Sequence, residues 1–296
     1  MNPAVLASGL GKRYGRRWAL RHTSLRVPCG RVVGLVGSNG AGKTTLIHLA
    51  VGLLRPSEGE ITVLGGQPGN GPEQLARVGF VAQDAPLYNR MTVEEHLEMG
   101  ARLNPGWDPA VTTDLLGRLD LDPRQHGGSL SGGQRAQLAL ALAIGKRPEL
   151  LLLDEPVASL DPLARREFMQ SLMVLASDGL SVVLSSHLLS DIERVCDYLI
   201  VLAHGEVRLA GDVDELLAEH RVLTGSRRDP LRLPTGQTLI RASHTDRQTT
   251  VVVRTHQDVL DPTWTVSNIG LEDLVLAYME SSSSPSHRLR SVENPW

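Results

Sequence analysis

The sequence predicts an α/β fold whose core is a parallel sheet with helices on both faces. Three continuously apolar segments, at residues 31–37, 150–153 and 181–186, have the pattern of fully buried strands. Helical patterns separate them along the chain, as expected for the crossovers of a parallel sheet. Ligands of such sheets bind beyond the carboxyl ends of the strands, so we expect a site where these three segments end.

The length and composition fit a globular protein with one main domain and a smaller appendage. The chain has 296 residues, of which 41% are hydrophobic and 21% charged, so it can bury a substantial core. Only 3% are aromatic, which argues against base-stacking platforms for single-stranded nucleic acid. Basic residues number 30 and acidic residues 33, a net charge of −3, so the electrostatic pattern of a nucleic-acid binder is missing. We expect no nucleic-acid partner.

The cysteines and the apolar stretches indicate the redox compartment of the protein and its relation to a membrane. Cys29 and Cys196 lie far apart and outside any metal-ligand spacing, so we expect two reduced thiols. Residues 1–10 lack the basic and apolar regions of a signal peptide. Apolar stretches such as residues 138–144 fall short of the ~18 residues that span a bilayer. Any membrane role is therefore expected to come through a partner chain.

Two further parts flank or interrupt the predicted sheet. Between about residues 84 and 145 the pattern becomes helical, with a capping-box signature at 92–95 and Ser131 before an apolar run. We interpret this segment as a helical subdomain inserted into the sheet lobe. After Gly211 the pattern predicts a small α+β unit, with a capped helix at 212–219, strands near 238–242 and 250–254, and an amphipathic helix at 271–280. Residues 281–296 are polar and of low complexity, which predicts a disordered tail.

A phosphate-binding loop follows the first apolar segment. Gly37-Ser-Asn-Gly-Ala-Gly-Lys43-Thr44 fits the pattern G-x-x-x-x-G-K-[ST], in which backbone N–H groups cradle phosphates at a helix N-terminus. The lysine supplies a positive charge to the β and γ phosphates, and the threonine hydroxyl can bind Mg²⁺. The predicted nucleotide-binding residues here are Gly37, Ser38, Asn39, Gly40, Ala41, Gly42, Lys43, Thr44 and Thr45.

Two adjacent carboxylates, Asp154 and Glu155, end the second apolar segment. Adjacent side chains on a strand point to opposite faces, so we expect two different roles. One carboxylate can hold Mg²⁺ through water while the other faces the γ-phosphate. Alone, the pattern also fits a strand that runs into a polar turn; beside a phosphate loop it favours the functional interpretation.

A second glycine-rich segment, Leu130-Ser-Gly-Gly-Gln134, opens another helix and is a second potential phosphate site. The alternative is a glycine turn that only caps the helix. One chain cannot easily bring both loops to one γ-phosphate. Two copies of the chain could clamp the same nucleotide between them.

Over residues 5 to about 220 the sequence resembles the ATP-binding cassette (ABC) family, the nucleotide-binding subunits of ABC transporters. The order of its motifs carries the resemblance: Tyr14, the loop 37–44, Gln83, the signature 130–134, the carboxylates 154–155, Ser159-Leu-Asp161 and His187. The resemblance implies a P-loop NTPase fold with an N-terminal antiparallel β part and the inserted helical subdomain. It implies an ABC domain at 1–220 and an accessory domain at 221–280.

The resemblance also implies roles for single residues. Tyr14 would stack on adenine, Gln83 would sense Mg²⁺ and the attacking water, Glu155 would polarise that water, His187 would contact the γ-phosphate, and Asp161 would couple two sites across a dimer. The implied catalytic residues are Lys43, Gln83, Glu155 and His187; the metal ligands are Thr44, Gln83 and Asp154; and the residues contributed by the opposite copy are Ser131, Gly132, Gly133 and Gln134.

The implied function is an ATPase that uses ATP and Mg²⁺ and dimerises to drive a separate integral-membrane permease from the cytoplasmic face of the membrane. A homodimer is favoured over a heterodimer. Residues 185–194 and 271–274 resemble bacterial exporters of the ABC-2 type. Val157 and Gln137 depart from the family pattern, where Thr and Arg are common; neither is a phosphate-binding position.

Two other functions compete with the transporter hypothesis. A soluble ABC-type ATPase that acts on ribosomes, DNA or cofactor assembly remains the main alternative, although paired cassettes and long coiled coils are missing from the sequence. A nucleotide-dependent switch with negligible turnover is disfavoured because Glu155 and His187 are both present.

Overall fold

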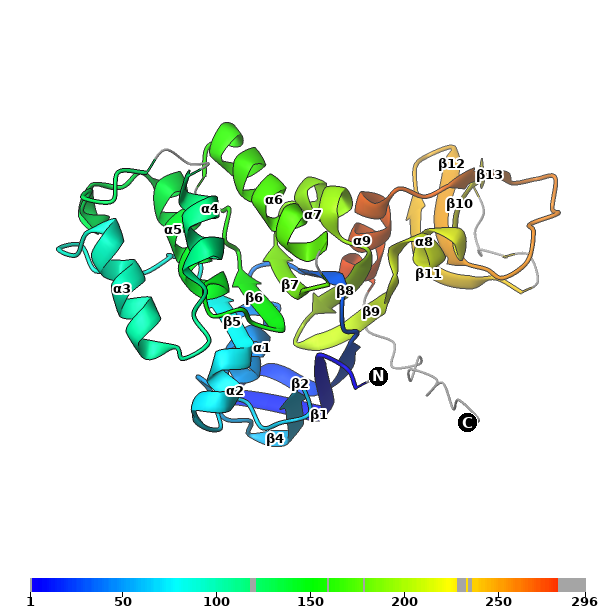
Figure 1. Cartoon of the computed structure of the whole chain (residues 1–296). Coiled ribbons are helices and arrows are strands. Elements are labelled where there is room, and N and C mark those ends of the chain that lie inside the picture. Colours follow the sequence, from blue (N-terminus) through cyan, green and yellow to red (C-terminus); the bar gives the residue numbers. More distant parts are fainter. Residues whose placement is uncertain are drawn as a thin grey trace.

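The computed structural model describes residues 2–117, 121–158, 160–177, 179–227, 233 and 236–281. Figure 1 shows a central sheet with a smaller sheet below it, a helical lobe at one end and a second β unit at the other. The tail expected to be disordered, at 281–296, lies outside the described residues except for Ser281, and Ser159 lies outside them too.

The central sheet has six strands, and its predicted parallel core is confirmed. Its strand order is β5-β6-β7-β3-β8-β9, in which the first five strands run parallel and β9 is antiparallel to β8. Val36 pairs with Ser186, and Asp154 pairs with Ser185, so the carboxyl ends of three neighbouring strands lie at the same level. The strands are β3 (Val32–Val36), β5 (Val78–Val81), β6 (Leu150–Asp154), β7 (Ser181–Ser186), β8 (Tyr198–Ala203) and β9 (Glu206–Asp212).

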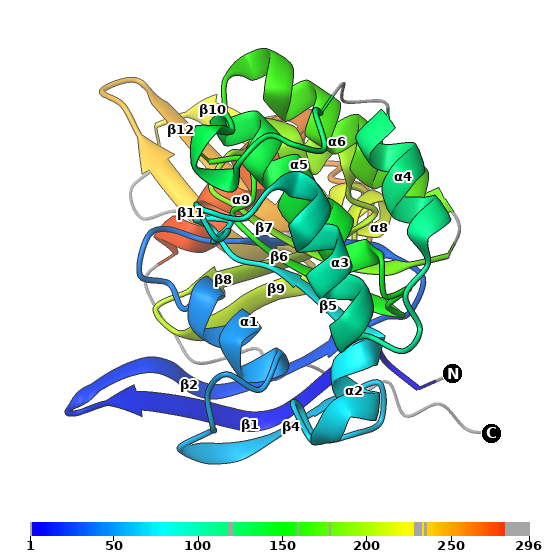
Figure 2. The ribbon, with the colours of Figure 1, turned by 60° about the vertical axis from the view of Figure 1, so that its left-hand side comes forward.

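The N-terminal antiparallel part is also confirmed. It is a three-stranded sheet in the order β2-β1-β4, formed by β1 (Val5–Tyr14), β2 (Arg17–Val27) and β4 (Glu58–Val63). Helix α1 (Lys43–Ala50) contacts both this sheet and β6, and their apolar side chains form one buried cluster. Figure 2 shows α1 between the two sheets. The phosphate loop, which precedes α1, is therefore held between two layers.

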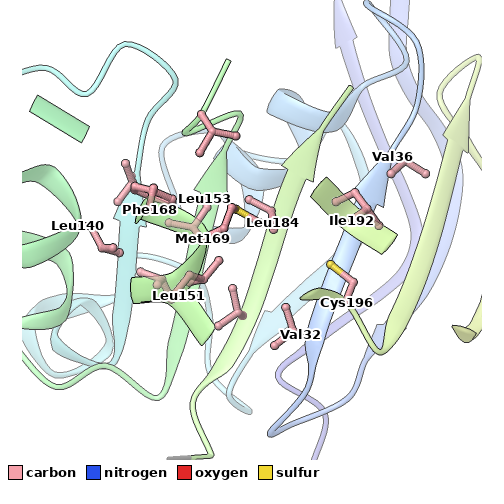
Figure 3. Packing of buried hydrophobic residues seen from close by; sticks show 14 of the residues in the cluster. Val32, Val36, Leu140, Leu151, Leu153, Phe168, Met169, Leu184, Ile192 and Cys196 are labelled. Carbon is pink, nitrogen blue, oxygen red and sulfur yellow. The ribbon is translucent and has the colours of Figure 1, made fainter. Parts of the chain in front are cut away.

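Helices α5 (Gly132–Ile144), α6 (Pro162–Ser177) and α7 (Leu189–Val195) belong to the larger core cluster on the other face of the central sheet. In Figure 3, Phe168 and Met169 of α6 lie close to Leu151 and Leu153 of β6. A Cβ atom added at Gly34 of β3 would lie 2.6 Å from Ile192, so this glycine permits the close approach of α7. Helix α7 follows His187, and its position determines where that residue lies.

The inserted segment is helical, as expected. It contains α3 (Val93–Leu103), α4 (Pro109–Gly117), a short 3₁₀ turn at 127–129, and α5. The predicted capping box at Thr92 is confirmed, because its hydroxyl accepts from Glu95 N–H at 3.2 Å and its own N–H donates to the Glu95 carboxylate at 2.7 Å. Helix α2 (Gly71–Arg77) precedes β5 and was not predicted.

The C-terminal unit is a four-stranded antiparallel sheet in the order β11-β12-β10-β13. The predicted helices and two of the strands are confirmed, whereas β10 and β13 were missed because neither alternates cleanly between buried and exposed residues. The last helix, α9, contacts α7 and β8 of the main domain as well as β11. The predicted boundary at 220/221 stays a prediction. The elements are α8 (Val213–Ala218), β10 (His220–Ser226), β11 (Thr238–His244), β12 (Gln248–Arg254), β13 (Thr265–Asn268) and α9 (Leu271–Glu280).

Candidate active site

The loop between β3 and α1 is built so that only glycine fits at two of its positions. A Cβ atom at Gly37 would lie 2.2 Å from the carbonyl oxygen of Leu202, and Gly42 has φ +110° with a hypothetical Cβ only 2.6 Å from the carbonyl oxygen of Ala19. Lys43 begins α1 with its side chain buried, and its Nζ donates to the carbonyl oxygen of Gly37 at 2.8 Å. The residues predicted to bind phosphate thus form a loop, 37–42, that leads into the first turn of α1, and Ser38, Asn39 and Gly40 are exposed.

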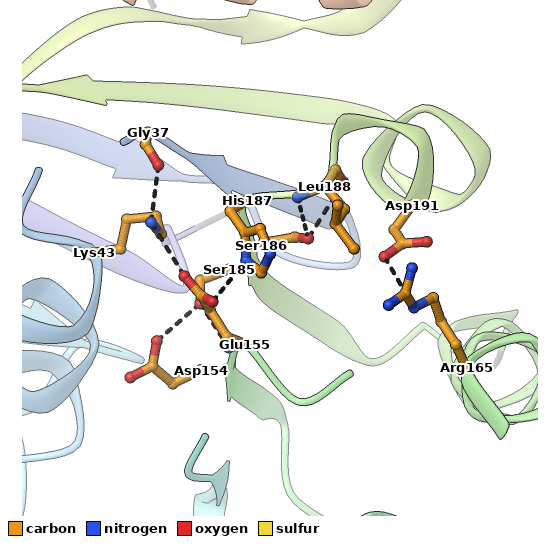
Figure 4. Close-up of polar contacts among 10 residues, drawn as sticks. All are labelled: Gly37, Lys43, Asp154, Glu155, Arg165, Ser185, Ser186, His187, Leu188 and Asp191. Carbon is orange, nitrogen blue, oxygen red and sulfur yellow. Dashed lines mark hydrogen bonds and ion pairs between the residues drawn. The ribbon is translucent and has the colours of Figure 1, made fainter. Parts of the chain in front are cut away.

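The two carboxylates at the end of β6 are joined by a serine that the sequence analysis did not select. The buried hydroxyl of Ser185 donates to Oδ1 of Asp154 at 2.8 Å and accepts from the N–H of Glu155 at 2.8 Å. Glu155 has φ +46°, in the left-handed region that non-glycine residues rarely adopt, and the bond to Ser185 holds it there. Figure 4 shows the two carboxylates pointing in different directions, as predicted. The pair of polar residues that ends the apolar strand β7 was the sequence signal for Ser185.

Glu155 contacts two other predicted catalytic residues. Its Oε1 lies 3.2 Å from Nζ of Lys43, and its Oε2 lies 2.8 Å from Nδ1 of His187. Burial alone would raise the pKa of Glu155, but the hydrogen bonds from His187 and Lys43 outweigh it, so the pKa is lowered. Glu155 is therefore an anion at neutral pH. The structure brings together Lys43 from the start of α1, Glu155 from the end of β6 and His187 from the end of β7 (Figure 4).

The residues expected to bind Mg²⁺ lie around the same edge. Asp154 is 1% exposed at the end of β6, Thr44 is exposed in the first turn of α1, and Gln83 follows β5, whose Val81 pairs with Leu153. A hydroxyl, an amide and a carboxylate supply the oxygen ligands that Mg²⁺ prefers, and Mg²⁺ usually takes its other ligands from phosphates and water. Within the described residues no group of three or more His, Cys, Asp and Glu side chains could hold a metal by itself. These residues fit a metal that binds together with a nucleotide.

The second glycine-rich segment forms a helix cap. Ser131 Oγ accepts from the N–H of Gln134 at 3.2 Å, and its own N–H donates to the Gln134 side chain at 2.9 Å. A Cβ atom at Gly133 would lie 2.7 Å from Cβ of Ala164, so this glycine allows α5 to approach the start of α6. Asp161 caps α6 by accepting from the N–H groups of residues 163 and 164. The described residues show no hydrogen bond or ion pair between residues 131–134 and the phosphate loop.

The remaining residues singled out from the sequence are Tyr14, Val157 and Gln137. Tyr14 ends β1 and is 51% exposed, and Nζ of Lys12 lies 5.6 Å from its ring centroid. Val157 is 1% exposed in the main core. Gln137 is 3% exposed, and neither atom of its amide has a hydrogen-bond partner within the described ranges.

Known proteins match this chain in sequence and in fold. A family profile described as "ABC transporter" matches residues 20–158, and one described as "AAA domain, putative AbiEii toxin, Type IV TA system" matches residues 128–190. Nod factor export ATP-binding protein I of Rhizobium sp. (strain N33) is 36% identical over 224 residues, which is 73% of each chain. Daunorubicin resistance ATP-binding protein DrrA3 of Streptomyces coeruleorubidus is 37% identical over 222 residues, 73% of this chain and 70% of that protein.

A solved structure gives the same result. A dimeric ATP-binding cassette in a post-hydrolysis state, bound to ADP and Pi, has a TM-score of 0.63 and 25% identity, and the match covers 71% of this chain and 98% of that one. The fold and the loop 37–44 define a P-loop nucleotide-binding cassette. The chain belongs to the family of ABC transporter ATP-binding proteins, and it is an ATP-binding and ATP-hydrolysing protein. No helix within the described ranges is both long and apolar enough to cross a membrane.

Proposed function

We propose that the chain is the ATPase subunit of an ABC exporter whose permease is a separate integral-membrane chain. The observation that carries the proposal is the contact of Glu155 with both Lys43 and His187 beside the phosphate loop. Two relatives named for export or drug resistance support the direction of transport. The subunit then lies at the cytoplasmic face of the membrane, held there by the permease.

The side chains of this site divide the work of phosphoryl transfer. The N–H groups of residues 37–45 and the Lys43 ammonium bind the phosphates, and Tyr14 stacks on adenine. Thr44, Gln83 and Asp154 hold Mg²⁺, which offsets phosphate charge. Glu155 is an anion at neutral pH, so it can orient the attacking water and accept hydrogen bonds from it. His187 is 43% exposed in its side chain and can reach the γ-phosphate.

A second subunit completes the site. Residues 131–134 open α5, and the α5 N-terminus favours an anion. Two copies related by a two-fold axis can place each of these segments over the phosphates of the other copy, with Asp161 between the two sites. A homodimer is favoured because this one chain carries both glycine-rich segments together with Glu155 and His187. ATP binding closes the dimer and hydrolysis opens it, which drives the permease.

The alternative is a soluble ABC ATPase without a permease. The two functions differ in where the protein is found when it is isolated with its native partners. A transporter subunit is recovered from membranes with an integral-membrane chain, whereas the alternative predicts that the protein purifies without one.

Cysteine cross-linking tests the ATP-dependent dimer. Ser38 and Ser129 are exposed and similar in size to cysteine, so Ser38→Cys and Ser129→Cys disturb little. The background is Glu155→Gln with exposed Cys29 and buried Cys196 changed to serine and alanine. We expect cross-links between subunits with Mg-ATP and few without nucleotide. Cross-links that do not depend on nucleotide, or an ATP-bound monomer at high protein concentration with the native partners present, would contradict the closed dimer.

A further inference from the structure

Strand β2 runs along the phosphate loop and brings an arginine to it. The carbonyl oxygen of Ala19 would lie 2.6 Å from a Cβ atom at Gly42, which places the middle of the strand against the end of the loop. Two residues earlier in β2, Nη2 of Arg17 would lie 3.8 Å from a Cβ atom at Gly40. The Arg17 guanidinium therefore lies beside the exposed turn of the loop, where it can reach a group bound there.

The register of the β1–β2 hairpin puts Arg17 beside Tyr14. These two residues are direct antiparallel partners, and the preceding pair is Arg13 with Trp18. Side chains of directly opposed residues share one face, and successive pairs alternate between faces. The Arg13 guanidinium lies 5.5 Å from the Trp18 ring centroid on one face. Tyr14 and Arg17 thus share the other face, while Arg16 lies in the turn.

The charges around the loop leave Arg17 available for a ligand. Lys43, the cation within the loop, is buried and bonded to Gly37 and Glu155. Arg17 is exposed, and we find no hydrogen bond or ion pair from its side chain to any residue that the structure describes. A guanidinium presents several N–H groups in a plane, and this geometry suits phosphate oxygens.

We infer that Arg17 is a second side-chain cation of the nucleotide site and contacts the phosphate chain of a nucleotide whose base stacks on Tyr14. The inference rests on the nucleotide site proposed above and adds a residue to it that no motif contains. Arg17 acts by binding, so its removal changes nucleotide affinity. Arg17 contributes to the binding of ATP and ADP but not to that of adenosine, which carries no phosphate.

Matched variants of the two adjacent arginines test this role. Arg17→Ala and Arg16→Ala remove the same charge from the same hairpin, but only the first removes the guanidinium that lies beside Gly40. We expect Arg17→Ala to weaken Mg-ATP and Mg-ADP binding about tenfold in calorimetric titrations. Adenosine binding, followed by saturation-transfer NMR, stays unchanged because Tyr14 is retained. Arg17→Lys recovers part of the affinity, and Arg16→Ala binds all three ligands like the wild type.

Three results would overturn the role of Arg17. They are wild-type ATP affinity in Arg17→Ala, an equal loss in Arg16→Ala, and an equal loss of adenosine and ATP affinity, which would mean that the hairpin itself was disturbed. Lys43→Ala, measured in parallel, separates this failure from that of the proposed function. If Lys43→Ala binds ATP normally, the nucleotide site as a whole is wrongly placed, and the role of Arg17 falls with it.

Discussion

Nζ of Lys43 lies 3.2 Å from Oε1 of Glu155, so the cation of the phosphate loop and the anion at the end of β6 form a buried ion pair. The side chain of Lys43 is 5% exposed and that of Glu155 is 11% exposed. Each charge therefore depends on the other for compensation, together with His187 on the far side of Glu155. A nucleotide phosphate that approaches Lys43 competes with Glu155 for the same ammonium group.

Lys43→Ala is expected to weaken Mg-ATP binding by about 10–100-fold, because a charge-assisted hydrogen bond contributes about 1.5–3 kcal/mol. The measurement is a calorimetric titration with Mg-ATP. Lys146→Ala is the matched control, since Nζ of Lys146 donates to the carbonyl oxygen of Leu75, away from the site. Equal ATP affinity in the two variants would mean that residues 37–45 do not bind the phosphates.

Ser185→Ala is expected to lower both stability and turnover. It leaves Oδ1 of Asp154 and the N–H of Glu155 without their buried partner, at a cost of about 1–3 kcal/mol in the free energy of unfolding. Urea denaturation measures this cost, and steady-state ATPase assays measure the turnover. Ser177→Ala removes an exposed hydroxyl that bonds to the carbonyl of Val174 and serves as control. Stability equal to that of the control would show that Ser185 does not hold the two carboxylates.

Asp191→Asn tests a buried carboxylate on α7. Burial raises the pKa of Asp191, although Arg165 and Arg194 oppose the shift, and its Oδ2 lies 4.0 Å from Nε of Arg165. A carboxyl group whose pKa is raised in the folded state destabilises the protein progressively as the pH rises from the group's ordinary pKa to its raised pKa. We therefore expect Asp191→Asn to be more stable than the wild type at pH 7.5, with a smaller gain near pH 4. Figure 4 shows Asp191 and Arg165 facing each other.

The measurement is urea denaturation at the two pH values, with exposed Asp258→Asn as control. A variant less stable than the wild type at pH 7.5 would mean that the Arg165 ion pair, despite its length, outweighs the cost of burial.

Much of the site was predictable because its residues occur in short motifs at strand ends. The loop 37–44 and the pair Asp154-Glu155 follow apolar segments, and those segments form neighbouring strands of one sheet. The contact of His187 with Glu155 depends on β6 and β7 being adjacent, which the sequence order of the strands does not determine. The family resemblance implied a separate role in ATP hydrolysis for each residue but not this contact.

Other features could not be predicted, since they depend on long-range packing. Ser185 bonds to residues about 30 positions away, and its only sequence signal is a polar residue at the end of an apolar strand. Arg17 reaches the loop only because the N-terminal sheet packs over α1. Strand β13 has four exposed residues and depends on pairing with β10. Periodicity detects one-sided burial, so it misses such a strand.

ATP turnover by Glu155→Gln shows whether the Glu155 carboxylate orients the attacking water. The amide keeps the size of the side chain but lacks the negative charge that orients water, and loss of a general base costs about 10²–10⁴-fold in rate. We predict that the rate constant of hydrolysis in single-turnover assays and kcat in steady-state assays both fall by this factor, while Mg-ATP affinity is retained. The control is Glu98→Gln, which makes the same substitution at an exposed position. Gln134→Glu would not serve as a control, because it alters the cap of α5. Near-wild-type hydrolysis by Glu155→Gln would contradict this role of Glu155 and transfer it to another group, with His187 the first candidate.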